Sequence, residues 1–158
     1  MKFGICANLD QAAAAQASGW DYIEESAQAL LEGLKPDADW QGARRVAAAQ
    51  LPVRACNLLV PASLKITGPD ADLAKLERYI NVVTQRAAAV GVKILVFGSA
   101  GARSVPDGFD RKRAHAELLD FARIAAESAA RCGITIVMEP LQRGESNIIN
   151  SVAEAMTI

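Results

Sequence analysis

The fold of this chain is decided by the stretch Ile134-Thr135-Ile136-Val137-Met138-Glu139-Pro140-Leu141-Gln142-Arg143-Gly144-Glu145-Ser146-Asn147. Its first five residues form an apolar, β-branched run, which is typical of a strand buried on both faces of a parallel sheet. A carboxylate, Glu139, then stands at the carboxyl end of the strand, where ligands collect in α/β sheets. A carboxylate buried there without a partner costs several kcal/mol. We therefore expect a bound cation or a positive neighbour beside Glu139.

Outward from this stretch, strand and helix signals alternate along the whole chain. We expect strands over residues 2–8, 22–26, 52–59, 92–98 and 134–138. We expect helices over residues 9–18, 27–34, 39–50, 72–90 and 110–132. Asp72 is the predicted cap of the fourth helix, and Gly19, Gly91 and Gly133 are the predicted helix ends. Two loops remain, a long one over 60–70 and a glycine-rich one over 99–108.

This alternation predicts right-handed βαβ crossovers and a parallel sheet, either an open doubly wound sheet or a barrel. The dinucleotide fingerprint is absent after the first strand, and no phosphate-binding G-x-x-x-x-G-K occurs. Polar residues instead follow nearly every expected strand, as they do around the mouth of a barrel: Asn8, Glu24, Asn57, Ser99 and Glu139.

A complete barrel needs about 250 residues, and this chain has 158 with five expected strands. Ser151 and Glu154 form a capping box that announces a further helix, yet the chain stops at Ile158. We therefore predict an α/β fold, a parallel (β/α) barrel truncated to about five βα units. Residues 1–158 are expected to form a single domain, the N-terminal five-eighths of a (β/α)8 barrel.

The composition excludes several classes of protein. The net charge is −1 and the charges are mixed, so neither nucleic acid nor an anionic membrane is favoured as a partner. No apolar run is long enough to cross a membrane, and the N-terminus lacks a signal-peptide pattern. Cys6, Cys56 and Cys132 are widely spaced in apolar surroundings, which predicts buried free thiols in a reducing cytoplasm rather than a disulfide or a zinc site.

Several motifs, in order along nearly the whole chain, resemble those of one family, and the most telling is Glu139-Pro140-Leu141 followed by Arg143, Glu145 and Asn147. The others are Gly19-Trp20-Asp21-Tyr22-Ile23-Glu24, Cys56-Asn57-Leu58-Leu59-Val60-Pro61, Leu64-Lys65-Ile66-Thr67-Gly68-Pro69, and Val96-Phe97-Gly98-Ser99 with Arg103 and Pro106-Asp107-Gly108-Phe109. Together they resemble the sugar phosphate isomerase/epimerase family of xylose-isomerase-like TIM barrels, which includes ketose 3-epimerases and hydroxypyruvate isomerase. Gln142 replaces the Asn that is common in the family's motif.

The resemblance implies a reaction and a site. Glu139 would be a ligand of a divalent metal, Mn²⁺, Mg²⁺ or Co²⁺, and one of two acid/base carboxylates. The chemistry would be proton transfer next to the carbonyl of a ketose or hydroxy-keto acid through an enediolate. Glu145 would hold substrate hydroxyls. The family's other metal ligands come from later strands, so the metal site is expected to be incomplete and the chain inactive alone.

Each candidate residue also has a plainer interpretation. Glu139 could be an ion-pair partner or a charge at a helix N-terminus, and Glu145 could be a solvated loop residue. Glu24 could contact the substrate or form an ion pair with an arginine, and the sequence favours neither. Arg103 could bind a substrate phosphate or be solvated. Asn57 is predicted to bind substrate.

Two other functions stay open. A non-catalytic half-barrel could act through its free sheet edges, because unpaired edges invite association, and we expect a homo-oligomer that covers them. Some barrels of this kind are also metal-dependent endonucleases that cleave DNA at abasic sites. The single histidine, His115, and the acidic charge balance argue against that activity.

Overall fold

The computed structural model describes residues 1–158 and contains one parallel sheet of five strands. The strands are β1 (Gly4–Cys6), β2 (Tyr22–Ser26), β3 (Val53–Asn57), β4 (Ile94–Phe97) and β5 (Thr135–Met138). Their spatial order is their order in the chain, and every neighbouring pair is parallel. The sequence prediction of a parallel α/β sheet is confirmed, with each strand inside its expected range.

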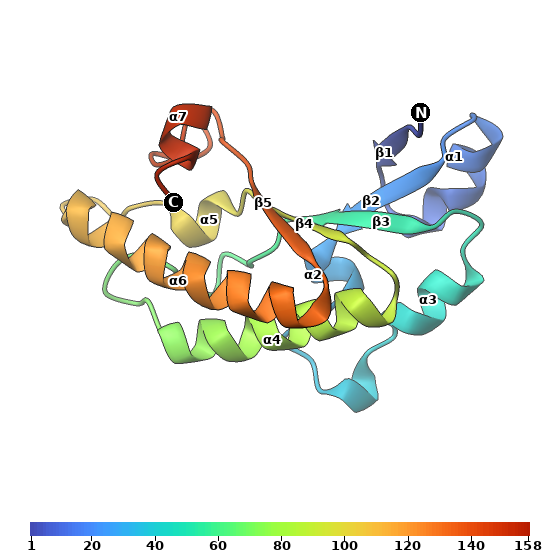
Figure 1. Ribbon diagram of the computed structural model, residues 1–158, viewed down its shortest axis with the longest axis horizontal. Helices are drawn as coiled ribbons and strands as arrows, with labels where there is room; N and C mark the ends of the chain where they lie inside the picture. Colours follow the sequence, from blue (N-terminus) through green and yellow to red (C-terminus); the bar gives the residue numbers. More distant parts are fainter.

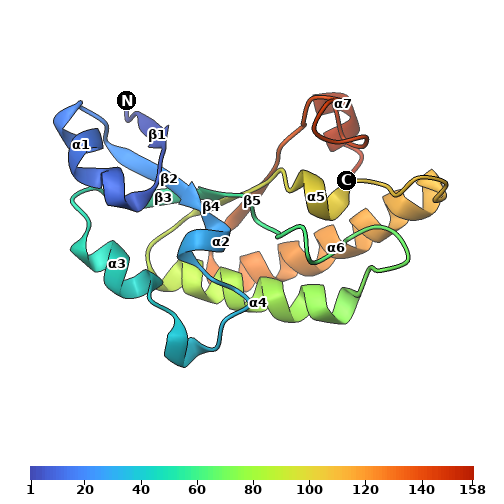
Figure 2. The same cartoon turned by 180° about the vertical axis from the view of Figure 1, so that it is seen from behind.

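The longest helices, α4 (Leu73–Ala89) and α6 (Arg111–Cys132), run side by side along one face of the sheet (Figures 1 and 2). The remaining helices are short: η1 (Leu9–Gln11), α1 (Ala12–Ala17), α2 (Ala27–Leu30), η2 (Asp37–Asp39), α3 (Gly42–Ala48), α5 (Ala100–Arg103) and α7 (Val152–Ala155). We call the face covered by α4 and α6 the outer face, and the opposite face the inner face.

The hydrophobic core lies between the outer face and the two long helices. Residues paired across parallel strands share a face, and the register pairs Cys56 with Leu95. These two side chains are fully buried. Phe97 at the end of β4 meets Phe121 of α6 edge to face, with ring centroids 5.1 Å apart. Each such buried side chain contributes about 1.5–3 kcal/mol through the area it removes from water.

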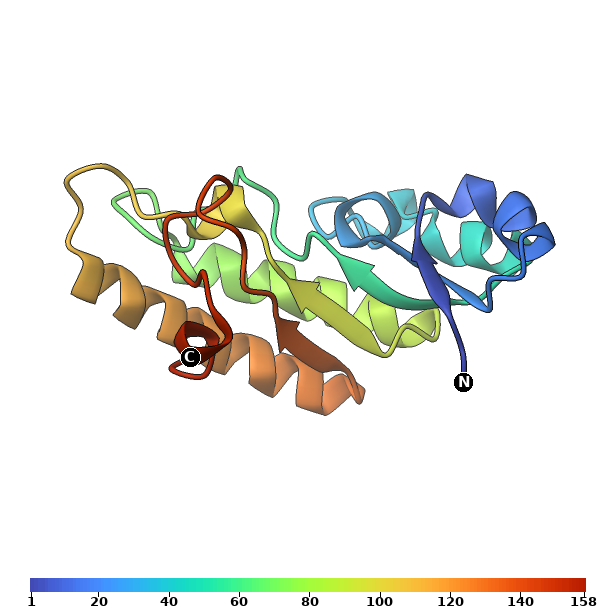
Figure 3. The same cartoon turned by 90° about the horizontal axis from the view of Figure 1, so that it is seen from above.

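No helix covers the inner face of β3, β4 and β5 (Figure 3). Ile94 and Val137 therefore keep 39% and 38% of their surface in contact with solvent. The prediction that residues 134–138 form a strand buried on both faces is wrong. The residues of β5 alternate between exposed and half-buried, because β5 is an edge strand with a packed layer on one side alone.

Local helix signals are mostly confirmed. Asp72 caps α4 by accepting a hydrogen bond from the Lys75 amide at 3.0 Å. Gly91 and Gly133 follow α4 and α6 with positive φ angles of 81° and 64°, the conformation that glycine adopts most easily. The helix expected over 27–34 ends at Leu30, and the helix expected over 39–50 spans Gly42–Ala48. The glycine-rich segment 99–108 contains the short helix α5 and is not wholly a loop.

A buried arginine ties the segment between α2 and α3 to α4. The guanidinium of Arg86, which is 4% exposed, lies 5.1 Å from the centroid of the Trp40 ring. It donates to the carbonyl oxygens of Leu31, Glu32 and Lys35 and to the carboxylate of Asp37. A segment with little regular structure is thereby fixed on the helical layer.

Candidate functional site

The inner face at the carboxyl ends of the strands is the candidate site. The register pairs Cys6 with Glu24, and Ser26 with Asn57, so these residues share one face of neighbouring strands. The side chain of Asn57 donates from Nδ2 to the Cys6 Sγ atom at 2.8 Å. The structure thus brings Glu24 and Asn57, which the sequence singled out, to the same part of the sheet.

Glu139 follows β5 on the same edge of the sheet, with its backbone fixed at both ends. Its amide donates to the carbonyl oxygen of Phe97 at 3.1 Å, and its carbonyl accepts from Arg103 Nη2 at 2.9 Å. The carboxylate lies directly over Gly98, where a Cβ atom would overlap the Oε2 atom of Glu139. Glycine at position 98 therefore leaves the space that this carboxylate occupies.

Glu139 is exposed, which corrects the prediction that it is a buried carboxylate. The open inner face provides the reason, because water reaches the end of β5. The expected positive neighbour is present in Arg103. Burial lowers the pKa of the Arg103 guanidinium, and the negative charge of Glu139 opposes that lowering.

Arg103 does not lie in solvent. The residue is fully buried in α5, and its guanidinium donates to Phe97 O at 3.1 Å, Glu139 O at 2.9 Å and Ile149 O at 3.3 Å. A further contact reaches the sulfur of Met138 at 3.3 Å. Since these acceptors occupy both terminal nitrogens, the geometry gives Arg103 a structural contact to Glu139 in place of the expected contact to substrate.

Glu145 lies in the loop after β5 and is exposed. The loop itself is held in place by Asn147. Its amide group accepts a hydrogen bond from the Val105 amide and donates one to the Val105 carbonyl, both at 2.9 Å. Asn150 adds donations to the carbonyls of Leu141 and Ser146. The loop that carries Glu145 is therefore anchored to the segment after α5.

Sequence reasoning missed two residues that shape this region. Gly98 was quoted within a motif but given no role, because no local signal distinguishes a glycine that leaves space for a carboxylate from one in a turn. Glu25 faces the opposite way from Glu24, is 3% exposed, and accepts hydrogen bonds from the amides of Leu9 and Ser26. The two-residue period of a strand was the signal that separates these neighbouring acids.

Nearby charges and burial also act on a thiol behind the site. Burial, with the negative charges of Glu25 and Glu24, raises the pKa of Cys56 to about 12. All three cysteines are free, with Cys56 buried, Cys132 half-buried and Cys6 exposed. The prediction of buried thiols is confirmed for Cys56 and is wrong for Cys6, which lies on the open face.

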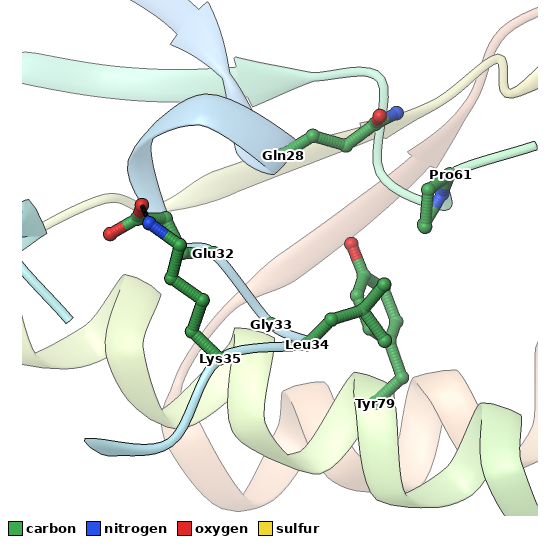
Figure 4. Close-up of a pocket in the computed structure, with 7 residues that line it drawn as sticks. All are labelled: Gln28, Glu32, Gly33, Leu34, Lys35, Pro61 and Tyr79. Carbon is green, nitrogen blue, oxygen red and sulfur yellow. Dashed lines mark hydrogen bonds and ion pairs between the residues drawn. The ribbon is translucent and has the colours of Figure 1, made fainter. Parts of the chain in front are cut away.

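A separate hollow of about 210 Å³, which Glu139 does not line, lies between α2 and α4. Figure 4 shows its lining residues. Its lining consists of Gln28, Glu32, Gly33, Leu34, Lys35, Pro61 and Tyr79. The Tyr79 hydroxyl donates to Leu59 O at 2.7 Å and Gln28 Nε2 to Leu58 O at 2.9 Å. These polar groups already serve the loop after β3, so the hollow offers few free groups to a ligand.

The chain by itself does not bring a set of metal ligands together. No three His, Cys, Asp or Glu side chains come together in a group that could hold a metal ion. His115 lies in α6, and its ring contacts the Thr157 hydroxyl at 3.1 Å, away from Glu139. No helix of the structure combines the length and hydropathy needed to span a membrane.

Solved structures similar to this chain include sugar epimerases. D-allulose 3-epimerase from Methylomonas sp., in complex with D-allulose, matches with a TM-score of 0.77 and 23% identity over 99% of this chain and 57% of that protein. D-psicose 3-epimerase from Clostridium cellulolyticum H10, solved with D-tagatose, matches with a TM-score of 0.72 and 18% identity over 98% of this chain and 57% of that protein.

A third similar structure is the IOLI protein with a bound zinc atom, with a TM-score of 0.56 and 15% identity over 87% of this chain and 51% of that protein. At these identities the likeness shows the fold. This chain spans a little over half the length of the structures it matches.

No curated protein matches the chain significantly. The sequence pattern of the xylose isomerase-like TIM barrel family, in contrast, matches residues 12–158, which is nearly the whole chain. The parallel sheet in chain order and the polar residues at its carboxyl edge agree with that match. The chain therefore belongs to the xylose isomerase-like TIM barrel family.

Proposed function

We propose that this chain carries part of the active site of a sugar or sugar phosphate isomerase/epimerase, with a hydroxy-keto acid as a related substrate class. One observation carries the proposal: Glu139 stands on the open face at the strand ends, with its backbone fixed and its carboxylate without a hydrogen bond to the protein. The likeness to 3-epimerases of D-allulose and D-psicose supports the substrate class.

In this proposal Glu139 is the base. Its carboxylate accepts a proton from the carbon next to the substrate carbonyl, the electron pair moves onto the carbonyl oxygen, and an enediolate results. Return of the proton to the former carbonyl carbon isomerises the substrate, with the hydroxyl proton passing from the neighbouring oxygen to the former carbonyl oxygen. Protonation of the original carbon on its opposite face, by a second acid, epimerises the substrate. Glu24, Asn57 and Glu145 are the proposed contacts to substrate hydroxyls. The buried guanidinium of Arg103 leaves it no such contact.

A divalent metal, Mn²⁺, Mg²⁺ or Co²⁺, belongs to the proposal as the group that would stabilise negative charge on the substrate oxygen. Glu139 fits as one ligand, because a free carboxylate on an open face suits hard cations. In this proposal the other ligands do not come from a cluster within residues 1–158, since this chain assembles no group of three.

We expect residues 1–158 alone to be inactive in turnover. An epimerase of this kind needs carboxylates on both faces of the substrate, and the chain supplies Glu139 on one. Binding is then the informative test, because the inner face can hold a sugar without completing the reaction.

The test is a titration of the ¹⁵N-labelled chain with D-allulose or D-tagatose and Mg²⁺, followed by NMR. We expect the amide shifts to change at Glu24, Asn57 and Glu139 and to stay unchanged at outer-face residues such as Leu95. A hexitol, which keeps the hydroxyls and lacks the carbonyl, is the matched ligand control. The Glu139→Gln variant should lose at least half of the shift change. Shifts confined to the hollow beside Tyr79, or none at millimolar sugar, would reject the proposal.

A second role, association through the open edge of the sheet, is favoured by a groove beside β5. The groove has a volume of about 210 Å³, and all its lining residues are apolar: Phe97, Phe121, Ala122, Ala125, Ala126, Ile136, Met138, Ala155 and Ile158. An unpaired strand edge beside such a groove favours pairing with another chain. We therefore propose a homo-oligomer of residues 1–158, and light scattering across a concentration series would refute it by giving a monomer throughout.

The endonuclease alternative has less support. Its metal chemistry requires several histidines, whereas His115 is the single one and lies in α6. We expect that abasic DNA will not retain the chain at low salt, because non-specific DNA binding rests on neutralising phosphates.

The cytoplasmic location of the chain stays a prediction.

A further inference from the structure

The guanidinium of Arg103 is a costly group to bury, and its contacts converge on the end of β5. The residue is fully buried, although burial of a charged group is unfavourable unless hydrogen bonds compensate it. Its donors reach three separate segments, at Phe97 of β4, Glu139 after β5 and Ile149 before α7. One side chain thus joins the ends of two neighbouring strands and the loop that follows.

These contacts fix Glu139 more tightly than the strand pairing alone would. Phe97 O accepts both the Glu139 amide, at 3.1 Å, and Arg103 Nη1, also at 3.1 Å. The Glu139 carbonyl accepts Arg103 Nη2. Both the N–H and the C=O group of Glu139 are therefore hydrogen-bonded. The backbone is held in place, and only the side chain remains free to rotate.

The side chain of Glu139 is in turn limited by Gly98. The backbone of Gly98 is buried beneath the carboxylate, and any Cβ at this position would overlap the Oε2 atom. The Cδ2 atom of Leu141 lies 3.5 Å from the same Cβ position, so the space is bounded on a second side. We call this space, bounded by Gly98 and Leu141, the notch at Gly98. Backbone anchoring and the notch together place the carboxylate on the inner face.

We infer that Arg103 is a positioning residue for the proposed base, because it holds the Glu139 backbone so that the carboxylate rests in the notch at Gly98. This inference rests on the proposed function for its meaning in catalysis, but the placement can be measured without any turnover. Lysine cannot replace arginine here, since one ammonium group cannot reach carbonyls on three segments as the planar guanidinium does.

Arg86 provides the matched control. It is also buried and also donates to three backbone carbonyls, but those belong to Leu31, Glu32 and Lys35, far along the chain from Glu139. Arg86→Lys should therefore lower stability to a similar degree as Arg103→Lys without disturbing Glu139. A role in stability alone would make the two variants equivalent at the site.

The measurement is the nuclear Overhauser effect between the Gly98 α protons and the Glu139 γ protons. We expect it in the unmodified chain and in Arg86→Lys, and a loss of at least half of its intensity in Arg103→Lys. Full intensity in Arg103→Lys would overturn the inference. Arg103→Met, which fills the space without a donor, is the second variant if the lysine variant does not fold. If both Arg103 variants unfold while Arg86→Lys folds, the residue serves general stability and the inference is also overturned.

A second readout uses Mn²⁺ alone as the probe. Paramagnetic broadening at the Gly98 and Glu139 amides is expected in the unmodified chain and in Arg86→Lys, is reduced at least twofold in Arg103→Lys, and is absent in Glu139→Gln. Equal broadening in the two arginine variants would contradict the inference. No broadening in the unmodified chain would reject the proposed metal role of Glu139, whereas the proton contact would still decide the role of Arg103.

Discussion

The two faces of this sheet differ in almost every physical property, although the same strands build both. On the outer face, Leu95 and Cys56 are fully buried beneath α4 and α6. On the inner face, Ile94 and Val137 are more than one-third exposed, and the polar residues Glu24, Asn57 and Glu139 share the carboxyl edge. The difference indicates that stability comes from one face and the proposed chemistry from the other.

The largest effect should come from emptying the outer face. Phe121→Ala removes a fully buried ring that packs on Phe97, and such truncations cost about 3–5 kcal/mol of the free energy of unfolding. Val137→Ala on the inner face removes a partly hydrated side chain and should cost less than about 1 kcal/mol. Urea unfolding followed by circular dichroism measures both values. Equal losses would show that the faces do not differ in this way.

An intermediate effect is expected from the Cys56 thiol at high pH. Its pKa in the folded chain is about 12, raised by burial above the ordinary value of 9.0, so its contribution to stability is complete below pH 9. As the pH rises from 9 towards 12, the thiol loses its proton in the unfolded chain before it does so in the folded chain. The free energy of unfolding therefore falls by up to about 1.4 kcal/mol per pH unit.

The check compares the unmodified chain with Cys56→Ala in urea unfolding at pH 8, 9.5 and 11. The difference in free energy of unfolding between the unmodified chain and Cys56→Ala should shrink steadily above pH 9. Tyrosines and lysines also titrate in this range, but they are common to both chains and cancel in the difference. Alkylation at pH 8.5 adds a test of the two faces, because the exposed Cys6 should react well before Cys56. An advantage that is constant with pH would refute the assignment.

The smallest effect on stability is expected at Glu139. Glu139→Gln changes an exposed carboxylate that accepts no hydrogen bond from the protein, so the free energy of unfolding should change by less than about 0.5 kcal/mol. The same variant is expected to lose the response to sugar and to Mn²⁺. A loss of several kcal/mol would place Glu139 among the residues that hold the fold, and would remove the contrast between the faces.

Signals that act within one or two turns of chain were sufficient to predict most elements. The strand Tyr22–Ser26 and the cap at Asp72 have local sequence signals, and the structure has both where the sequence places them. Long-range neighbours decide the rest. The exposure of β5 depends on whether another element packs on the inner face. The sequence of residues 134–138 alone does not predict this.

The candidate site shows the same division. The position of Glu139 after a strand was readable, because strand ends of a parallel sheet collect polar groups. The burial of Arg103 could not be predicted from the sequence, since its four acceptors belong to segments up to 46 residues away. The notch at Gly98 could not be predicted from the sequence either, because it depends on a close approach between the residue after β4 and the residue after β5.

The chain order of the strands bears on how the molecule is made. Each strand pairs with the one synthesised just before it, and α6 packs on α4, the long helix that precedes it. No strand waits for a distant partner, so the loop that must close at each step is short, and short closures favour rapid folding. During synthesis the sheet can grow one βα unit at a time on the ribosome. The newest strand is then always the template for the next.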